Sequence, residues 1–403
     1  MMLSKFSKLL ESGKTWKIVF DGIEYDVNSI RNIIINNWNS WSETIASLDD
    51  DGYILVVANN SFQYLVCILL SSCFNLKIIM AGSKQLLYFI ESDFDFNIKC
   101  IISAKEYDIE NVPNLHLTLD TRDHPVSNWG ELVTDTDVQA EIMFCTSGTT
   151  SNFKIAKYRE SRLYDNAEVV SEYMGLLEKD NCLCFFPTNY MYGFSVSMSM
   201  LIGGGRVFLE RSTISAAMIL EYLQNHNITL LPLIGSIASD LVKVINSKYY
   251  FDDLKVMNAS DKIYESQVED ILSICPEFWN NMGQTESGPR IFTQRITNRD
   301  EIRDYSLNGV IALGNPVHEG IKISIRNEQG EECDLNEVGE LYYNSVFSMD
   351  KYLNVENAMD QWYSSGDLVK KGSNGVVYWV GRKSQLVKVN GIFVNINLLA
   401  STF

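Results

Sequence analysis

The chain has 403 residues, of which 46% are hydrophobic, and this is enough for a packed core with more than one domain or subdomain. Seven prolines are few, so the composition excludes long disordered or low-complexity segments. The formal net charge of -18 argues against a nucleic-acid surface, because such a surface needs an excess of Lys and Arg.

The sequence also argues against secretion and against a membrane span. The N-terminal stretch MMLSKFSKLLESGKTW has no long apolar core, and the apolar run 62–74 is shorter than the roughly 20 residues that a span needs. Eight cysteines are scattered through apolar context. The close pair Cys182 and Cys184 has no second pair or histidine nearby to complete a zinc site. We therefore expect free thiols and a cytoplasmic protein.

Short β-rich runs alternate with helical patterns through much of the chain. Strands are predicted at 53–60, 76–82, 98–104, 115–119, 141–147, 182–186, 206–210, 228–234 and 255–260. Helices are predicted at 61–74, 161–178, 195–202, 215–225, 236–247 and 264–274. This alternation predicts an α/β fold with parallel sheets and crossover helices. From about residue 310 the pattern changes to short alternating strands with Gly and Asn turns, which predicts a small antiparallel β module.

A cluster of small and hydroxyl-bearing residues, Thr146 to Ser151, lies between the apolar run EIMFC (141–145) and Lys154. Inward-pointing backbone amides and hydroxyls can bind phosphate oxygens, and a lysine adds positive charge. The loop follows a strand and precedes the helix predicted from 161, which suits phosphate binding at the edge of an α/β sheet. The Walker spacing is absent, so this pattern alone leaves a polar surface loop open as the alternative.

Three further motifs follow: Asn-Met-Gly-Gln-Thr-Glu at 281–286, Tyr-Ser-Ser-Gly-Asp at 363–367, and Gly381-Arg382. In this order and spacing, the chain resembles the adenylate-forming superfamily of acyl- and aryl-CoA synthetases, luciferases and peptide-synthetase adenylation domains. Softer matches at 314–320, 338–343 and 351–354 extend the resemblance over about residues 20–400.

The resemblance implies an architecture. Residues 1–380 would form the AMP-binding N-terminal domain, and residues 381–403 a hinge with a stub of the C-terminal domain. Within 1–380, two packed and mostly parallel α/β subdomains would occupy about 1–310, and a small antiparallel β-barrel-like subdomain about 311–380.

It also implies a reaction, in which ATP activates an aryl or aliphatic carboxylic acid as an acyl adenylate. A thiol of CoA or of carrier-protein phosphopantetheine then takes the acyl group. Since two anions must meet, cations and donors have to surround the phosphates. Lys154, Thr285 and Glu286 would be the catalytic residues, with Glu286 as a ligand of Mg²⁺.

The resemblance also implies which residues contact the ligands. The residues implied to contact ATP, with Asp367 binding the ribose hydroxyls, are Thr146, Ser147, Gly148, Thr149, Thr150, Lys154, Ala259, Ser260, Met282, Gly283, Gln284, Thr285, Asp367 and Arg382. The residues implied to contact the carboxylic acid are Tyr190, Tyr192, Phe194, Ser195 and Gly288. Core packing is the alternative for the aromatic members of this second set.

The residue at 195 bears on the kind of acid. Amino-acid-activating members carry an Asp that pairs with the substrate ammonium, whereas this chain has Ser195 there. A buried ammonium without a partner is costly, so we expect a small-molecule carboxylic acid rather than an α-amino acid. An acyl carrier protein is a further candidate partner.

Several positions depart from the family pattern. Ser151, Phe153 and Ile155 replace a glycine, a proline and a second glycine, Met282 replaces a tyrosine expected on adenine, and Ser384 replaces the hinge aspartate. Family members continue past Gly391 into a mobile C-terminal domain with a catalytic lysine. Either the natural protein is short or a longer chain was cut after the hinge, and without that domain the resemblance implies slow adenylation. A degenerate nucleotide-binding member without chemistry and an amino-acid adenylation domain stay as alternatives.

Overall fold

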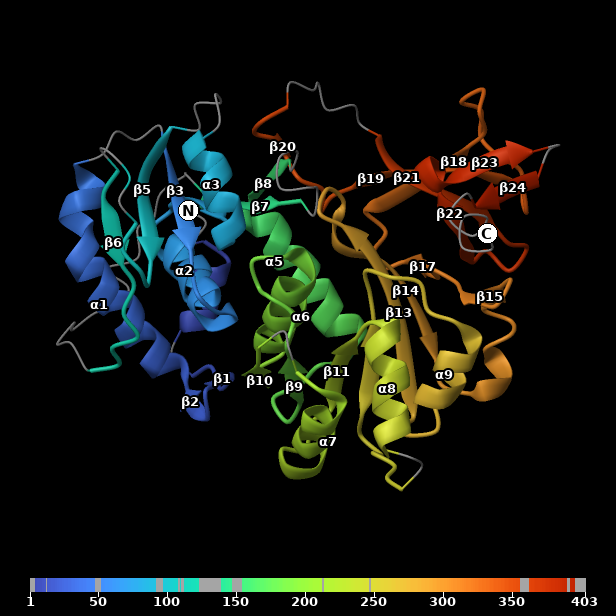
Figure 1. Ribbon diagram of the computed structural model, residues 1–403, viewed down its shortest axis with the longest axis horizontal. Helices are drawn as coiled ribbons and strands as arrows, with labels where there is room; N and C mark the ends of the chain where they lie inside the picture. Colours follow the sequence, from blue (N-terminus) through green and yellow to red (C-terminus); the bar gives the residue numbers. More distant parts are fainter. Residues whose placement is uncertain are drawn as a thin grey trace. The chain divides into compact units, whose positions relative to one another are not determined.

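The computed structural model describes residues 4–11, 13–47, 52–91, 97–107, 109, 112–122, 139–146, 154–211, 214–245, 248–355, 362–389 and 392–395. Four predicted phosphate-loop residues, Ser147, Gly148, Thr149 and Thr150, lie outside these ranges. The chain divides into two compact units, whose elements are labelled in Figure 1. The first unit comprises Met1–Ser215, His226–Ile228 and Phe347–Ala358, and the second comprises Ala216–Asn225, Thr229–Val346 and Met359–Phe403.

The first unit contains most of the long helices. Its helical segments are the 3-10 helix η1 (Phe6–Leu10), α1 (Val27–Ala46), α2 (Ser61–Cys73), α3 (Ser83–Glu91), α5 (Glu160–Tyr173) and α6 (Met191–Ile202). Its strands are β1 (Lys17–Phe20), β2 (Ile23–Tyr25), β3 (Tyr53–Val57), β4 (Lys77–Met80), β5 (Ile98–Ser103), β6 (Asn114–His116), β7 (Glu141–Cys145), β8 (Ile155–Arg159), β9 (Asn181–Cys184), β10 (Arg206–Leu209) and β20 (Lys351–Tyr352).

One sheet of the first unit runs in the order β20-β8-β7-β4-β3-β5-β6. The strands from β7 to β6 are parallel, while β8 and β20 add antiparallel pairs at one edge. In a second set, β9, β10 and β1 are parallel and β2 pairs with β1 antiparallel. Ile78, Ile79 and Met80 of β4 are all buried, as expected for a parallel strand that is covered on both faces. The predicted α/β fold is confirmed.

Helices α2 and α6 lie inside the core of this unit. Nearly every residue of both helices is buried, which is typical of helices that are surrounded by other elements. Phe194 of α6 packs edge-on against Phe144 of β7 and Phe6 of η1, with ring centroids 5.2 and 6.0 Å apart. The Asn60 side chain caps α2 by accepting a hydrogen bond from the Gln63 amide at 3.0 Å. Helix α6 begins at Met191 rather than at 195, and α1 was not among the predicted helices.

The sequence pattern also missed a strand after the predicted phosphate loop. β8 follows that loop directly and pairs antiparallel with β7, so α5 begins only at Glu160. The loop therefore connects two neighbouring strands instead of leading into a helix.

The second unit is richer in antiparallel strands. Its helical segments are α7 (Ala216–Asn225), α8 (Gly235–Ile245), α9 (Glu265–Ile271), η2 (Arg299–Glu301) and η3 (Lys383–Gln385). Its strands are β11 (Leu230–Leu233), β12 (Lys255–Asn258), β13 (Glu277–Gln284), β14 (Gly288–Ile296), β15 (Ser306–Leu307), β16 (Val310–Ile311), β17 (Asn315–Pro316), β18 (Ile321–Arg326), β19 (Val338–Ser345), β21 (Tyr363–Lys371), β22 (Val377–Arg382), β23 (Leu386–Val389) and β24 (Ile392–Asn395).

Two sheets organise this unit. β11, β12 and β13 are parallel, and β14 and β17 continue the series with antiparallel pairs. A four-stranded antiparallel sheet runs in the order β18-β19-β21-β22, which confirms the predicted antiparallel module. The sequence pattern had not named β13 and β14, because their polar residues break the usual apolar alternation.

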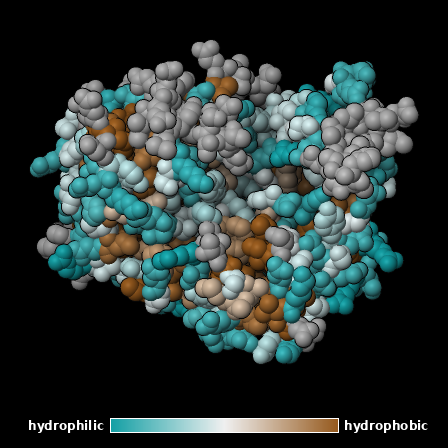
Figure 2. Space-filling view, viewed as in Figure 1, coloured by the Kyte–Doolittle hydropathy of each residue, from teal (hydrophilic) through white to brown (hydrophobic). Residues whose placement is uncertain are grey.

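The hydropathy of the surface and the state of the cysteines can be compared with what the composition predicts. Figure 2 shows hydrophilic residues with smaller hydrophobic patches over the face in view. The eight cysteines are free; Cys333 is half-buried and the others are buried. Among the described helices, none combines the length and the apolar character that a membrane crossing requires.

Gly314 is required by both its backbone and its surroundings. Its φ is 90°, a left-handed conformation that disfavours any side chain, and a Cβ there would lie 1.9 Å from the Thr293 carbonyl oxygen. Gly330 has a similar φ of 83°, but a Cβ there would meet nothing within 4 Å.

We expect Gly314→Ala to lower the free energy of unfolding by more than about 3 kcal/mol, because backbone strain and overlap add. Gly330→Ala, which introduces strain alone, should cost about 1–2 kcal/mol. Urea denaturation of both variants measures the difference. Equal losses would contradict the close approach of β14 to Gly314.

Candidate functional site

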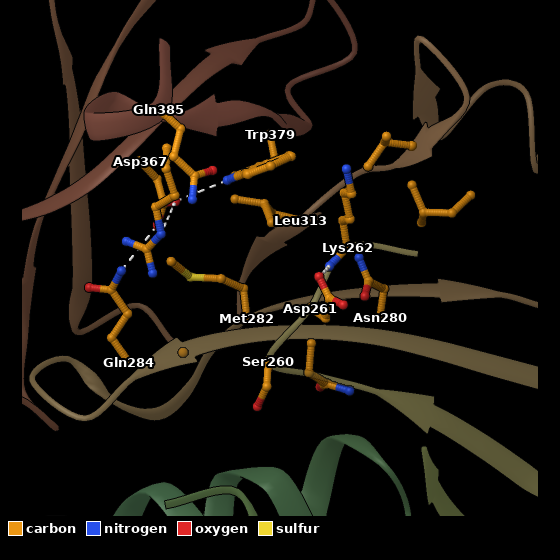
Figure 3. A pocket seen from close by; sticks show the side chains of 15 residues that line it. Ser260, Asp261, Lys262, Asn280, Met282, Gln284, Leu313, Asp367, Trp379 and Gln385 are labelled. Atoms are coloured by element: carbon orange, nitrogen blue, oxygen red, sulfur yellow. Dashed lines mark hydrogen bonds and ion pairs between the residues drawn. The ribbon is translucent and has the colours of Figure 1, made fainter. Parts of the chain in front are cut away.

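A cavity of about 300 Å³ lies within the second unit, at the C-terminal ends of β12 and β13. Figure 3 shows Met282, Asp261, Asn280 and Ser260 nearer the strands, with Asp367, Trp379 and Gln385 across from them. The residues that line it are Ser260, Asp261, Lys262, Asn280, Asn281, Met282, Gly283, Gln284, Val310, Ile311, Leu313, Asp367, Trp379, Arg382 and Gln385. Six residues of the predicted nucleotide set line this one cavity: Ser260, Met282, Gly283, Gln284, Asp367 and Arg382.

Asp367 is the buried charge of this cavity, with only 4% of its surface exposed. The Trp379 indole donates from Nε1 to Oδ1 at 2.9 Å, and the Gln284 amide donates from Nε2 to Oδ2 at 3.0 Å. Arg382 Nε lies 3.3 Å from Oδ1. Burial raises the pKa of Asp367, and the three donors act in the opposite direction. The carboxylate is thus an acceptor held in a defined place.

Local backbone structure explains how Asp367 and Gln284 reach one another. Asp367 stands opposite Arg382 in the β21–β22 pair, and the preceding Gly366 has a φ of 68° that allows the turn of the Ser-Ser-Gly-Asp segment. In the β13–β14 hairpin the register shifts between Met282 and Gln284. A Cβ on Gly283 would lie 2.1 Å from the Pro289 carbonyl oxygen, so only glycine fits there. The Gln284 side chain also donates to the Ser365 carbonyl at 2.9 Å and accepts from the Tyr343 hydroxyl at 3.3 Å.

A row of asparagines shapes the opposite wall. Asn258, fully buried at the end of β12, donates from Nδ2 to Asn280 Oδ1 at 2.9 Å and to the Asp261 carbonyl at 2.8 Å. Asn280 donates in turn to the Ala312 carbonyl at 2.8 Å. Ser260, in the loop that these bonds hold, has a φ of 71°. Such a conformation is costly for serine, and residues of this kind cluster at functional sites.

A charged pair links β19 to η3, the short helix that follows Arg382. Lys383 Nζ is 2.6 Å from Glu340 Oε2, and Glu340 Oε1 accepts from the Ser364 hydroxyl at 2.5 Å. Burial alone would raise the pKa of Glu340, but the hydrogen bonds from Lys383 and Ser364 outweigh it and the pKa is lowered. The pair fastens η3, which follows Arg382, to β19.

In the first unit, the two ends of the predicted phosphate loop are joined by hydrogen bonds. The Thr146 amide donates to the Lys154 carbonyl at 2.8 Å, and the Lys154 amide donates to Thr146 Oγ1 at 3.0 Å. Lys154 Nζ lies 4.7 Å from the centre of the Tyr352 ring, a cation–π contact. Asn354 Oδ1 accepts from the Ile155 amide at 2.9 Å. The segment around β20 therefore contacts the chain where the loop rejoins the sheet at β8.

The residues predicted for the acid pocket differ in exposure. Tyr190, at the N-terminus of α6, is 40% exposed, and the Tyr192 ring packs 4.6 Å from the Phe186 ring. Phe194 and Ser195 are fully buried, and Ser195 Oγ has no hydrogen-bond partner among the described residues. Gly288 belongs to the second unit, where it begins β14.

The other predicted residues are also placed on identifiable elements. Thr285 and Glu286 occupy the half-buried turn between β13 and β14, and Ala259 is buried directly after β12. Sequence reasoning missed Trp379, Gln385 and the buried pair Asn258 and Asn280. An indole two positions before a Gly-Arg motif carries no signal of its own, since only the strand pairing brings it to Asp367.

Comparison with known proteins places the chain in a family. The sequence profile described as "AMP-binding enzyme" matches residues 104–353, well over half of the chain. The chain belongs to the AMP-binding enzyme family. The resemblance drawn from the sequence motifs is therefore confirmed.

Two of the curated relatives are named as CoA ligases. The chain is 26% identical over 260 residues to 4-coumarate–CoA ligase-like 2 of Arabidopsis thaliana, covering 61% of this chain and 44% of the relative. It is 24% identical over 267 residues to 2-succinylbenzoate–CoA ligase of Enterococcus faecalis, covering 64% of this chain and 52% of the relative. The matched segment thus spans about half the length of these relatives.

Solved structures share the fold at low sequence identity. The o-succinylbenzoate CoA synthetase of Bacillus subtilis, solved with its acyl-adenylate intermediate, has a TM-score of 0.77 at 15% identity, covering 98% of this chain and 81% of that one. A four-domain nonribosomal peptide synthetase bound to AMP and glycine has a TM-score of 0.80 at 15% identity, covering 98% of this chain and 30% of that one.

The Glu340–Lys383 pair predicts a pH-dependent effect on stability. Because the folded-state pKa of Glu340 lies below its unfolded value of about 4.3, the pair stabilises the fold above that pH, and the effect is lost as pH falls through the folded pKa. Lys383→Met should lower the free energy of unfolding at pH 7 by at most about 1 kcal/mol, since Lys383 is 61% exposed, and this loss should disappear once the pH falls below the lowered folded-state pKa of Glu340. Denaturation at a series of pH values measures this.

The matched control is Lys243→Met, whose partner Asp240 is 71% exposed. This variant should change little at any pH. A loss of stability in Lys383→Met that does not depend on pH would mean that packing, and not the charge of Glu340, is responsible.

Proposed function

We propose that this chain binds ATP and activates a carboxylic acid as an acyl adenylate for transfer to a thiol. The observation that carries the proposal is the buried Asp367 carboxylate, held by three donors at the wall of a cavity in a member of the AMP-binding enzyme family. A carboxylate in this state suits the recognition of neighbouring hydroxyls, which a ribose supplies.

The residues that line the cavity suit the groups of a nucleoside. Asp367 accepts from the ribose hydroxyls, with Arg382 beside it. The base lies between Met282 of β13 and the segment of Ala259 and Ser260, where a thioether and backbone groups offer a flat apolar contact. Gly283 lets β14 pass close to β13 beside the cavity.

The phosphates require hydroxyl donors and positive charge. Thr146 and Lys154, with the loop between them, provide hydroxyl and ammonium donors for the β- and γ-phosphates, and Thr285 provides a hydroxyl for the α-phosphate. The carboxylate of Glu286 is a hard oxygen ligand in a half-buried turn, which fits Mg²⁺. When bound, the ion would neutralise phosphate charge.

The reaction is a displacement at phosphorus followed by an acyl transfer. A carboxylate oxygen of the acid forms a bond with the α-phosphorus as the bond to the bridging oxygen of pyrophosphate breaks. A thiolate sulfur then attacks the acyl carbon, and AMP leaves with the electron pair of the C–O bond. Lys154 and Thr285 stabilise the first transition state by holding charge that the phosphates develop. The acceptor is either CoA or carrier-protein phosphopantetheine.

The acid is proposed to be aryl or aliphatic, since the position at which amino-acid-activating members carry an Asp is Ser195. Its buried hydroxyl supplies no negative charge for an ammonium. Tyr190 and Tyr192 give the start of α6 an aromatic character that suits an apolar acyl group.

The first test is calorimetric titration of Mg·ATP into the protein and into Asp367→Asn. We expect the variant to bind at least about tenfold more weakly, because it exchanges an ionic acceptor of the ribose hydroxyls for an amide. Asp240→Asn, at an exposed position of α8, is the control and should bind as the unmodified chain does. No binding to the unmodified chain at millimolar ATP would overturn the proposed function.

The second test separates the classes of acid. With ATP, Mg²⁺ and hydroxylamine, acyl adenylates are trapped as hydroxamates, and we expect product from aryl or aliphatic acids but not from α-amino acids. In Ser195→Asp, the reaction with those acids should weaken, because a buried carboxylate disfavours an apolar acyl group. Product from α-amino acids alone, in the unmodified chain, would overturn the assignment of the substrate class.

A further inference from the structure

We infer that Trp379 is a positioning residue, whose indole N–H fixes the Asp367 carboxylate so that the cavity prefers a ribonucleotide over its 2′,3′-dideoxy analogue. This inference rests on the proposed function, since it concerns how the same carboxylate selects its ligand.

Strand pairing brings the indole to the carboxylate. Asp367 and Arg382 stand opposite one another in the β21–β22 pair, and a register shift between Leu368 and Val369 places Trp379 opposite Val369. The extra residue created by this shift turns the strand locally. Trp379 is half-buried, lines the cavity, and donates from Nε1 to Asp367 Oδ1 at 2.9 Å. Figure 3 shows Trp379 and Asp367 on the same side of the cavity.

Each oxygen of the carboxylate has one short hydrogen bond from a side chain. Trp379 donates to Oδ1, and Gln284 donates to Oδ2. The terminal torsion of an aspartate is soft, so a carboxylate held through one oxygen can rotate. Donors on both oxygens fix its plane, because rotation about the Cβ–Cγ bond would break both hydrogen bonds.

Arg382 cannot replace the indole in this role. Its contact with Oδ1 is the longest of the three at 3.3 Å, and its side chain is 46% exposed. Its Nη1 also donates to the Ser365 carbonyl at 3.0 Å. In contrast, the indole is a rigid donor on a strand, and it has a single hydrogen to give.

The count of acceptor positions explains why orientation matters for a diol. An ionised carboxylate offers about four lone-pair positions, and the three donors occupy three of them. To accept hydrogen bonds from two ribose hydroxyls, Asp367 therefore uses the fourth lone-pair position, on Oδ2, and the position on Oδ1 from which Arg382 moves away. Both positions point to the diol only while the plane of the carboxylate stays fixed. A ligand without the two hydroxyls does not depend on that plane.

The chain offers a matched control for this hydrogen bond. Trp279 donates from Nε1 to Glu277 Oε2 at 2.9 Å, the same kind of bond at the same length, and it does not line the cavity. Trp279→Phe removes that bond, as Trp379→Phe removes the bond to Asp367.

The experiment compares the dissociation constants of Mg·ATP and of Mg·2′,3′-dideoxy-ATP by calorimetry for the unmodified chain and both variants. We expect the unmodified chain and Trp279→Phe to prefer ATP. Trp379→Phe should bind ATP about tenfold more weakly and the dideoxy analogue within about twofold of the unmodified chain, so that the preference is largely lost.

Two results would overturn the inference while the proposed function stands. In the first, Trp379→Phe keeps the full preference for ATP. In the second, it loses affinity for both nucleotides equally, which indicates a structural role of the ring. If the unmodified chain binds neither nucleotide at millimolar concentration, the proposed function fails and the inference fails with it.

A rescue variant covers the case in which Trp379→Phe does not fold. Trp379→His retains a ring N–H donor in a smaller ring. It should fold and keep a preference for ATP, since the donor and not the indole is what Asp367 requires. A folded Trp379→His with no preference for ATP, or one that also fails to fold, would show that the shape of the indole matters and would overturn the inference.

Discussion

A carboxylate with 4% of its surface exposed is stable only where donors replace the water it has lost, and the second unit is arranged around that requirement at Asp367. The donors come from β13, from β22 and from the end of β22. Placing them requires Gly283, which lets β14 approach β13, and Gly366, which turns β21. One buried charge therefore accounts for this wall of the cavity and for the glycines at positions 283 and 366.

Much of the candidate site could be predicted because its residues lie within continuous motifs. The segment 281–286, the segment 363–367 and Gly381-Arg382 are short runs whose spacing along the chain is itself informative, and six of the predicted residues line one cavity. The α/β alternation could be predicted as well, since buried parallel strands such as β4 are almost wholly apolar.

Features that depend on pairing between distant segments could not be predicted. The short segment Ile-Ala-Lys-Tyr-Arg of β8 is recognised as a strand only through its pairing with β7. β13 was not predicted because its sequence is polar. Trp379 reaches Asp367 through an irregularity in the register of β21 and β22, which no local pattern reports. The roles of Ser147, Gly148, Thr149 and Thr150 stay predictions, since these residues lie outside the part of the chain that the structure describes.

The small strand β20 has a consequence for the order in which the chain can fold. It belongs to the first unit, yet the Asn354 side chain bonds to the Ile155 amide across a separation of 199 residues. During synthesis, the outer edge of β8 has no strand from this region to pair with until most of the second unit has left the ribosome. Long-range pairing of this kind slows folding, and an open strand edge invites association with other chains. The nascent protein is therefore most exposed to aggregation late in translation, between the emergence of β8 and that of β20.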